Sequence, residues 1–383
     1  MKENNIVYLD NAATTRPYEE VVAAYLDVAA HHFGNPSSLH LVGYDASHLL
    51  REARDRVLSS LGVNKTHEAV FTSGATESNN LFLFSVARRY QNRGKKIITS
   101  MGEHPSVLNV FKALEKEGFE TVYLPLTLGG AVDPEDLRKA MDKNTILVSI
   151  MGVNNETGAM SDLRDMSAIA KGYPKCFFHS DLTQAVGKVD VPSSLLDAFS
   201  FSGHKIGALK GSGALVYRKN IAFPSYEEGG EQEGGHRPGT VDVAGSYALS
   251  LALERSMKEA KENEQKVALL RDKVISYLER RSDEFAINSP ASGSPYLLSF
   301  SLLKKKAAVY VEGLSEEGIA VSSVSACSSK RENTSYVIEA MGLGKERAAH
   351  VVRMSFAPFN TEGDIDRFIA VSDELLGRLV NQR

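Results

Sequence analysis

Short apolar segments rich in β-branched and aromatic residues alternate with stretches of helical periodicity between residues 65 and 220. The segments predicted as strands cover residues 68–72, 96–99, 121–126, 145–151, 176–179, 198–202 and 213–217. Apolar strands separated by helical segments are typical of mostly parallel sheets covered by helices on both faces. The sequence therefore predicts an α/β fold. Ligands of such sheets bind beyond the carboxyl ends of the strands, so the residues that follow each strand are candidates for a site.

A second region follows this alternating segment. A polar, glycine-rich loop at 227–240 precedes a long amphipathic pattern over 245–281, whose length suits a connection between two domains. The remaining residues, about 282–383, have an α+β pattern with strands near 296–301 and 351–356. We therefore expect a large domain over 15–255 and a smaller α+β domain formed by 1–14 and 256–383.

Charge balance and cysteine content argue against several classes of protein. With 44 Lys and Arg against 48 Asp and Glu, the net charge is −4 and no basic tract is present, which argues against nucleic-acid binding. No apolar run of about 18 residues predicts a membrane span, and the amino-terminal residues lack a secretory pattern. Cys176 and Cys327 are too few for a disulfide framework or a zinc ribbon. We expect a cytoplasmic protein without a bound metal.

Two charged side chains that follow predicted strands indicate a cofactor. A buried Lys205, after strand 198–202, would favour the neutral amine that forms Schiff bases, and a solvated loop lysine is the alternative. Asp181, after strand 176–179, would pair with a protonated pyridine nitrogen or else cap a helix. A Schiff-base lysine with an aspartate partner is what a pyridoxal-phosphate site requires.

Three more polar positions follow strands of the same predicted sheet. The turn at 73–76 precedes a helix predicted over 76–90, and free N–H groups at a helix N-terminus bind phosphate, although such turns are also common without a ligand. His104 would stack on an aromatic ring or relay a proton, with an ordinary loop histidine as the alternative. Asn155 offers an amide, or it is a turn asparagine. Their convergence on one sheet edge favours a common site.

Motifs spread in order from about residue 6 to residue 375 carry a family resemblance. They are YLDNAATT at 8–15, FGNPSSLH at 33–40, TSGATESN at 72–79, EHPS at 103–106, VNNETG at 153–158, SFSGHK at 200–205 and RPGT at 237–240. With these motifs the sequence resembles the pyridoxal-phosphate-dependent cysteine desulfurases of the NifS and IscS type, within the class V aminotransferase family. The resemblance implies a fold-type I enzyme whose large domain binds the cofactor.

The resemblance also implies how pyridoxal 5'-phosphate would be held. Lys205 would form the internal aldimine, Asp181 would keep the ring nitrogen protonated, and Gln184 would donate to the ring phenolate oxygen. His104 would stack on the ring, and His104 or another base would help to deprotonate a thiol. Further cofactor contacts are implied for Ala75, Thr76, Asn155, Ser202 and His204.

Two further matches imply the substrate contact and the oligomeric state. Arg353 would clamp the α-carboxylate of L-cysteine in a bidentate pair, assisted by Asn155, and a surface salt bridge is the alternative for this arginine. Thr240 matches a residue that reaches the cofactor phosphate of the neighbouring subunit, which implies a homodimer.

The two cysteines receive different interpretations. Cys176 stands in the apolar segment 175–179, which is typical of a buried, unreactive thiol. Cys327 lies among small polar residues at 321–329, where a small core residue is the alternative, and the family motif SACSS implies a nucleophile there. L-Cysteine would then yield L-alanine and a persulfide on Cys327. The sulfur would pass to an acceptor protein, for example in iron–sulfur cluster assembly or tRNA thiolation.

Other functions fit part of the same pattern. One is another enzyme of the class V fold, such as an aminotransferase or a selenocysteine lyase, and the second is a non-catalytic sulfur-relay subunit. Val324 stands where a glycine is common, and segment 206–211 lacks the family's usual Tyr-Gly-Pro pattern. These departures leave the cofactor motifs unchanged and concern the pocket wall and the loop before Cys327.

Overall fold

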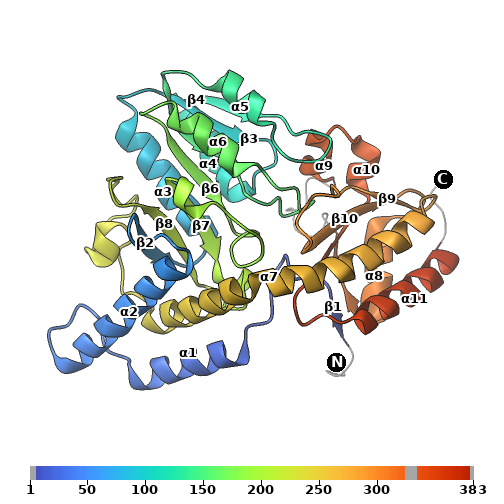
Figure 1. Cartoon of the computed structure of the whole chain (residues 1–383), viewed down its shortest axis with the longest axis horizontal. Helices are drawn as coiled ribbons and strands as arrows, with labels where there is room; N and C mark the ends of the chain where they lie inside the picture. The colour runs from blue at the N-terminus through green and yellow to red at the C-terminus, as the bar shows by residue number, and fades with distance from the viewer. Residues whose placement is uncertain (1–5, 324–333, 380–383) are drawn as a thin grey trace.

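The computed structural model describes residues 6–323 and 334–379, and its largest element is a seven-stranded sheet (Figure 1). Its strands are β2 (His67–Thr72), β3 (Lys96–Ser100), β4 (Glu120–Leu124), β5 (Thr145–Ser149), β6 (Phe177–Asp181), β7 (Ala198–Ser202) and β8 (Gly213–Arg218). They lie in the order β2-β8-β7-β6-β5-β3-β4, in which β8 is antiparallel to both β2 and β7 and the other neighbouring pairs are parallel. The predicted α/β fold with a mostly parallel central sheet is confirmed.

Alternate side chains of this sheet enter two separate hydrophobic clusters. Ile97 and Leu147 pack in the cluster that contains apolar residues of α3 (Ala75–Tyr90) and α4 (Pro105–Lys116). The neighbouring Ile98 and Val148 belong to the second cluster, which includes residues of α6 (Leu163–Lys171). Successive strand residues point to opposite faces of a sheet. A sheet covered on both faces therefore requires apolar residues at odd and even positions of each strand, and the sequence has them.

A smaller sheet of four antiparallel strands has the order β12-β13-β10-β9. Its strands are β9 (Phe285–Ile287), β10 (Leu297–Leu302), β12 (Ser322–Ser323) and β13 (Val351–Ser355). Near it, β1 (Val7–Tyr8) pairs in parallel with β11 (Ile319–Ala320), and Asp10 bridges to Ser355. The amino-terminal segment therefore passes from the small sheet to the edge of the central sheet.

The helix α7 (Val243–Arg280) connects the two sheet regions (Figure 1). Its 38 residues span about 57 Å at the rise of an α-helix. It packs against α1 (Glu19–His31), α2 (Leu41–Ser60) and α11 (Glu362–Arg378). The remaining α-helices are α5 (Pro134–Ala140), α8 (Ala307–Glu316), α9 (Tyr336–Ala340) and α10 (Lys345–Ala349). No helix in the described ranges is long and apolar enough to cross a membrane.

Candidate active site

The predicted site residues converge at the carboxyl edge of the central sheet. Asp181 is the last residue of β6, and Lys205 ends the 3₁₀ turn η3 (Gly203–Lys205) directly after β7. A cavity of about 360 Å³ lies at this edge. Its walls include Ala75, Thr76, His104, Asn155, Asp181, Gln184, Ser202, His204, Lys205 and Arg353. The cavity therefore gathers every described residue that was predicted for cofactor or substrate, except Thr240.

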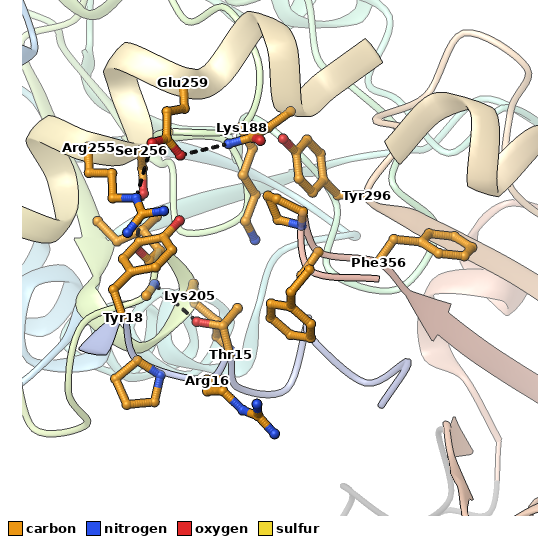
Figure 2. Close-up of a pocket in the computed structure, with 18 of the residues that line it drawn as sticks. Thr15, Arg16, Tyr18, Lys188, Lys205, Arg255, Ser256, Glu259, Tyr296 and Phe356 are labelled. Atoms are coloured by element: carbon orange, nitrogen blue, oxygen red, sulfur yellow. Dashed lines mark hydrogen bonds and ion pairs between the residues drawn. The ribbon is translucent and has the colours of Figure 1, made fainter. Parts of the chain in front are cut away.

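Lys205 is half-buried and its amine is directed at the backbone of the amino-terminal segment. Its Nζ donates to the carbonyl oxygens of Ala12 at 2.5 Å and Ala13 at 2.6 Å. Behind it lies a second cavity of about 500 Å³, which Lys205 lines together with Tyr18 and Tyr296 (Figure 2). Lys205 therefore stands between two cavities, and the alternative of a solvated loop lysine does not describe its surroundings.

Asp181 is buried, with 4% of its surface exposed. Its Oδ2 accepts a hydrogen bond from Asn79 Nδ2 at 2.8 Å, and its Oδ1 accepts one from the backbone N–H of Thr183 at 3.0 Å. No helix begins directly after β6, so the alternative of a helix cap is not realised. The two bonds fix the orientation of a carboxylate in the cavity wall.

His104 caps the N-terminus of α4, a role that the sequence analysis did not identify. Its Nδ1 accepts from the backbone N–H of Ser106 at 3.2 Å, and Pro105 occupies the first helical turn. Desolvation lowers the pKa of His104, nearby Asp181 opposes this effect, and Lys205 adds to it. The imidazole is therefore neutral at pH 7, and the accepting role of Nδ1 assigns its proton to Nε2.

The predicted phosphate end of the cavity lies where α3 begins. The Ala75 N–H, expected to be free for an anion, donates to Ser202 Oγ at 2.8 Å. Gly74 allows this close approach, because a Cβ atom there would lie 3.3 Å from the same oxygen. Burial lowers the pKa of His204 to about 4, and the charges of nearby lysines act in the same direction. An adjoining cavity of about 390 Å³ is lined by residues at the start of α3 and by residues of the segment 202–211, which begins at the end of β7.

Arg353 projects from β13 and is almost fully buried. Its Nη2 lies 3.1 Å from Asp10 Oδ1, and its Nη1 donates to the backbone oxygen of Asn155 at 3.1 Å. Arg353 therefore forms an ion pair with Asp10 inside the molecule. The alternative interpretation required an ion pair at the surface.

Several buried polar atoms around the cavity have no hydrogen-bond partner among the residues that the structure describes. They are Arg353 Nε, Asn155 Oδ1, Thr183 Oγ1 and His204 Nδ1. Buried polar groups are normally paired, and such exceptions are expected where a ligand supplies the missing partners. A lysine amine, a carboxylate and these unpaired groups fit a polar cofactor with a ring nitrogen, a phenolate and a phosphate.

One described residue of the predicted site lies apart from this cavity. Thr240 is exposed on the loop before α7 and is not part of the lining. Cys327 lies outside the described residues. Cys176 is buried in the hydrophobic core, which confirms the predicted burial, and burial raises the pKa of its thiol, as expected for the unreactive cysteine that was predicted. Within the described ranges, no group of three or more His, Cys, Asp or Glu is arranged to hold a metal ion.

Sequence reasoning missed three residues that hold the site together. Asp10 pairs with Arg353, Asn79 binds Asp181, and Lys188 donates to Gln184. Asp10 and Asn79 stand inside the quoted motifs at 8–15 and 72–79, so their positions in those motifs were the available signal.

A lysine and an aspartate that face one cavity at the carboxyl edge of a mostly parallel sheet are typical of fold-type I pyridoxal-phosphate enzymes. Residues 7–368 match the family model of aminotransferase class V, and the chain belongs to this family. The chain is 39% identical over 382 residues to "Cysteine desulfurase IscS" of Dictyoglomus turgidum, covering 97% of this chain and 95% of that protein.

Solved structures show the same likeness. The structure of a "NIFS-like protein" has a TM-score of 0.91 and 34% identity, covering 98% of this chain and 100% of that one. The structure described as "SspA in complex with cysteine" has a TM-score of 0.77 and 28% identity, covering 92% of this chain and 99% of that one. The similarity therefore extends over both sheet regions and the cavity between them.

Proposed function

We propose that this chain is a pyridoxal-phosphate-dependent cysteine desulfurase that converts L-cysteine to L-alanine and transfers the sulfur to Cys327. The observation that carries the proposal is the single cavity shared by Lys205, Asp181 and Arg353. It occurs in a chain 39% identical to a curated cysteine desulfurase over nearly its full length. The cysteine complex of a protein 28% identical to this chain supports the class of substrate.

The cavity residues have the chemistry that pyridoxal phosphate requires. When bound, this cofactor supplies an electron sink that lowers the cost of removing the substrate Cα proton. Lys205 would hold the cofactor covalently and then carry that proton on Nζ. Asp181, fixed by Asn79 and Thr183, would accept the ring N–H, and neutral His104 would lie against the ring face. Further contacts are expected from Ala75, Thr76, Gln184, Asn155, Ser202 and His204.

Arg353 would bind the α-carboxylate of the substrate. Its guanidinium is already held by Asp10 on one side and by the Asn155 carbonyl on the other, so little side-chain freedom is lost on binding. The buried Nε of Arg353 and Oδ1 of Asn155 have no partner within the described ranges and remain for the ligand. This arrangement would orient the Cα–H bond toward the cavity end that holds Lys205.

Sulfur transfer would use the Cys327 thiolate. The S–S bond forms to the substrate sulfur as the Cβ–S bond breaks and Cβ gains a proton, so the products are L-alanine and a persulfide. Cys327 follows β12, whose Ser322 pairs with Arg353 in β13. The chain therefore enters the segment that contains Cys327 from a position beside the proposed carboxylate site.

We also propose a homodimer in which Thr240 contacts the cofactor phosphate of the partner subunit. Arg237 of the same loop pairs with Glu77 of α3 at 2.9 Å, close to the helix end that would bind phosphate. An exposed threonine on a loop held in this way supports a contact across a subunit boundary. A sulfur-acceptor protein, a cytoplasmic location and the domain boundary at residue 255 stay predictions.

Product analysis tests the proposed function. Purified protein supplied with pyridoxal phosphate and L-cysteine is expected to release L-alanine and transferable sulfur in equal amounts, without an added oxo acid. An aminotransferase would form no alanine without an oxo acid, and a selenocysteine lyase would act on L-selenocysteine alone. A sulfur-relay subunit would turn over no amino acid. Any of these three results contradicts the proposal.

The Arg353→Lys variant is expected to raise the KM for L-cysteine by about tenfold or more while cofactor binding stays unchanged. Lysine retains the charge but lacks the planar fork that binds a carboxylate through two parallel hydrogen bonds. Steady-state kinetics and cofactor titration measure the two effects. Arg347→Lys is the matched control, since Arg347 binds Asn288 in the small sheet region and does not line the cavity. Loss of the cofactor from Arg353→Lys would contradict the substrate role.

A further inference from the structure

Lys188 is a buried lysine whose charge no carboxylate balances in the described ranges. Its Nζ donates to Gln184 Oε1 at 2.9 Å and lies 5.9 Å from the centre of the Tyr296 ring. Figure 2 shows the side chains of Lys188 and Tyr296. Burial lowers the pKa of Lys188 to about 7, and the charges of Lys205 and Arg353 add to this effect. Because burial of a charged lysine is unfavourable, we expect Lys188 to have a functional role.

The neighbours of Gln184 determine which way its amide faces. Lys188 Nζ carries N–H donors in either charge state, and its ammonium form offers only donors, so the amide oxygen of Gln184 faces Lys188. On the other side, Gln184 Nε2 donates to the Ala12 carbonyl oxygen at 3.0 Å, which accepts only. Turning the amide over would place two donors together at Lys188 and two acceptors together at Ala12. The second N–H of Gln184 is thereby kept for the cavity that this residue lines.

The same contacts link Lys188 to Lys205. The Ala12 carbonyl oxygen that accepts from Gln184 also accepts from Lys205 Nζ at 2.5 Å. Lys188, Gln184, Ala12 and Lys205 therefore form one continuous hydrogen-bonded chain. A change at Lys188 is transmitted first to the amide of Gln184 and not to the cavity wall as a whole.

We propose that Lys188 is a positioning residue that fixes Gln184 as a hydrogen-bond donor toward the phenolate oxygen of the bound cofactor. This inference rests on the proposed function, because it requires pyridoxal phosphate in the cavity. A donor stabilises a negatively charged phenolate, whereas an amide oxygen turned toward it would repel that charge. Lys188 thus acts through Gln184 and touches neither substrate nor cofactor.

The absorbance of the reconstituted protein at fixed pH tests this role without any measurement of turnover. The charged phenolate form of the lysine-linked cofactor absorbs in the visible range, and the neutral form absorbs in the near ultraviolet. Lys188→Met removes the donor and keeps the apolar length of the side chain. We expect the ratio of visible to near-ultraviolet absorbance to fall by about three- to tenfold, the effect of one lost hydrogen bond.

A double-mutant cycle shows whether the effect passes through Gln184. In the Gln184→Ala background, Lys188→Met is expected to change the absorbance ratio no further, because the amide that it orients is gone. Lys305→Met is the matched control, since it removes another buried lysine, one that lies near Glu284 in the small sheet region, and the spectrum should stay unchanged. Lys188→Gln, which keeps an N–H donor without a charge, is expected to retain a spectrum close to that of the wild type.

The possible results separate this inference from the proposed function. A wild-type protein without a visible cofactor band would overturn the proposed function itself. A wild-type band that Lys188→Met leaves unchanged would overturn only the role of Lys188. An equal effect of Lys188→Met with and without Gln184 would also overturn it. If Lys188→Met does not fold, Lys188→Leu, which also removes the donor, takes its place, and an unchanged absorbance ratio in that variant would overturn the role.

Discussion

The Lys205→Ala variant is expected to lose turnover of L-cysteine by a factor of about 10³ or more, even with saturating cofactor. The change removes both the proposed covalent link to the cofactor and the amine that would carry the Cα proton, and a positioned general base alone contributes about 10² to 10⁴. The remaining cavity, including Asp181, is unchanged, so the protein should still bind the cofactor without a covalent bond. Alanine formation and the visible absorbance of the lysine-linked cofactor are the measurements.

Lys219→Ala serves as the control for this variant. Lys219 forms a half-exposed ion pair with Glu68, does not line the cavity, and should leave both readouts unchanged. If Lys205→Ala retained more than about a tenth of the wild-type rate, a loss far below that expected for general acid–base catalysis, the role of Lys205 would be wrong.

Replacing Cys327 by serine is expected to abolish sulfur transfer and to reduce alanine formation by about 10² or more, while the spectrum of the bound cofactor stays the same. A serine hydroxyl is not ionised near neutral pH and does not displace carbon from sulfur, whereas a thiolate does. Steady-state alanine release and transfer of labelled sulfur from L-cysteine measure the two effects.

The chain supplies its own control for this variant, because it contains one other cysteine. Cys176→Ala is expected to retain activity and to lose some stability, since it removes a buried sulfur from the hydrophobic core. Full activity of Cys327→Ser, or loss of sulfur transfer in Cys176→Ala at unchanged cofactor content, would reverse the assignment of the two thiols.

The periodicity of the sequence predicted the elements of the fold well but not all of their ends. The strand at 198–202 was found as predicted, because its apolar residues end where the chain turns. The strand predicted to end at residue 179 continues through Ser180 and Asp181, since these polar residues pair with β7. The predicted helix over 245–281 begins earlier, at Val243, because the Asp242 side chain accepts from the Gly245 N–H. Pairing and capping of this kind depend on contacts that hydrophobic periodicity does not contain.

The site was predictable where one residue carries the chemistry by itself. Lys205 and Asp181 could be found because they stand at the ends of predicted strands. The contacts of Asp10 and Lys188 could not be found, because each acts through a partner that only the folded chain brings near. Asp10 meets Arg353 across almost the whole length of the sequence, and Lys188 matters through the orientation of one amide. The role of Cys327 rests on its motif alone.

Mass spectrometry of the protein after addition of L-cysteine tests the central claim most directly. We predict one added sulfur atom on the peptide that contains Cys327, none on the peptide that contains Cys176, and no addition in Lys205→Ala. The added sulfur should disappear on treatment with a reducing thiol, as expected for a persulfide. Sulfur on Cys176, or alanine formed in the absence of any sulfur on Cys327, would contradict the account.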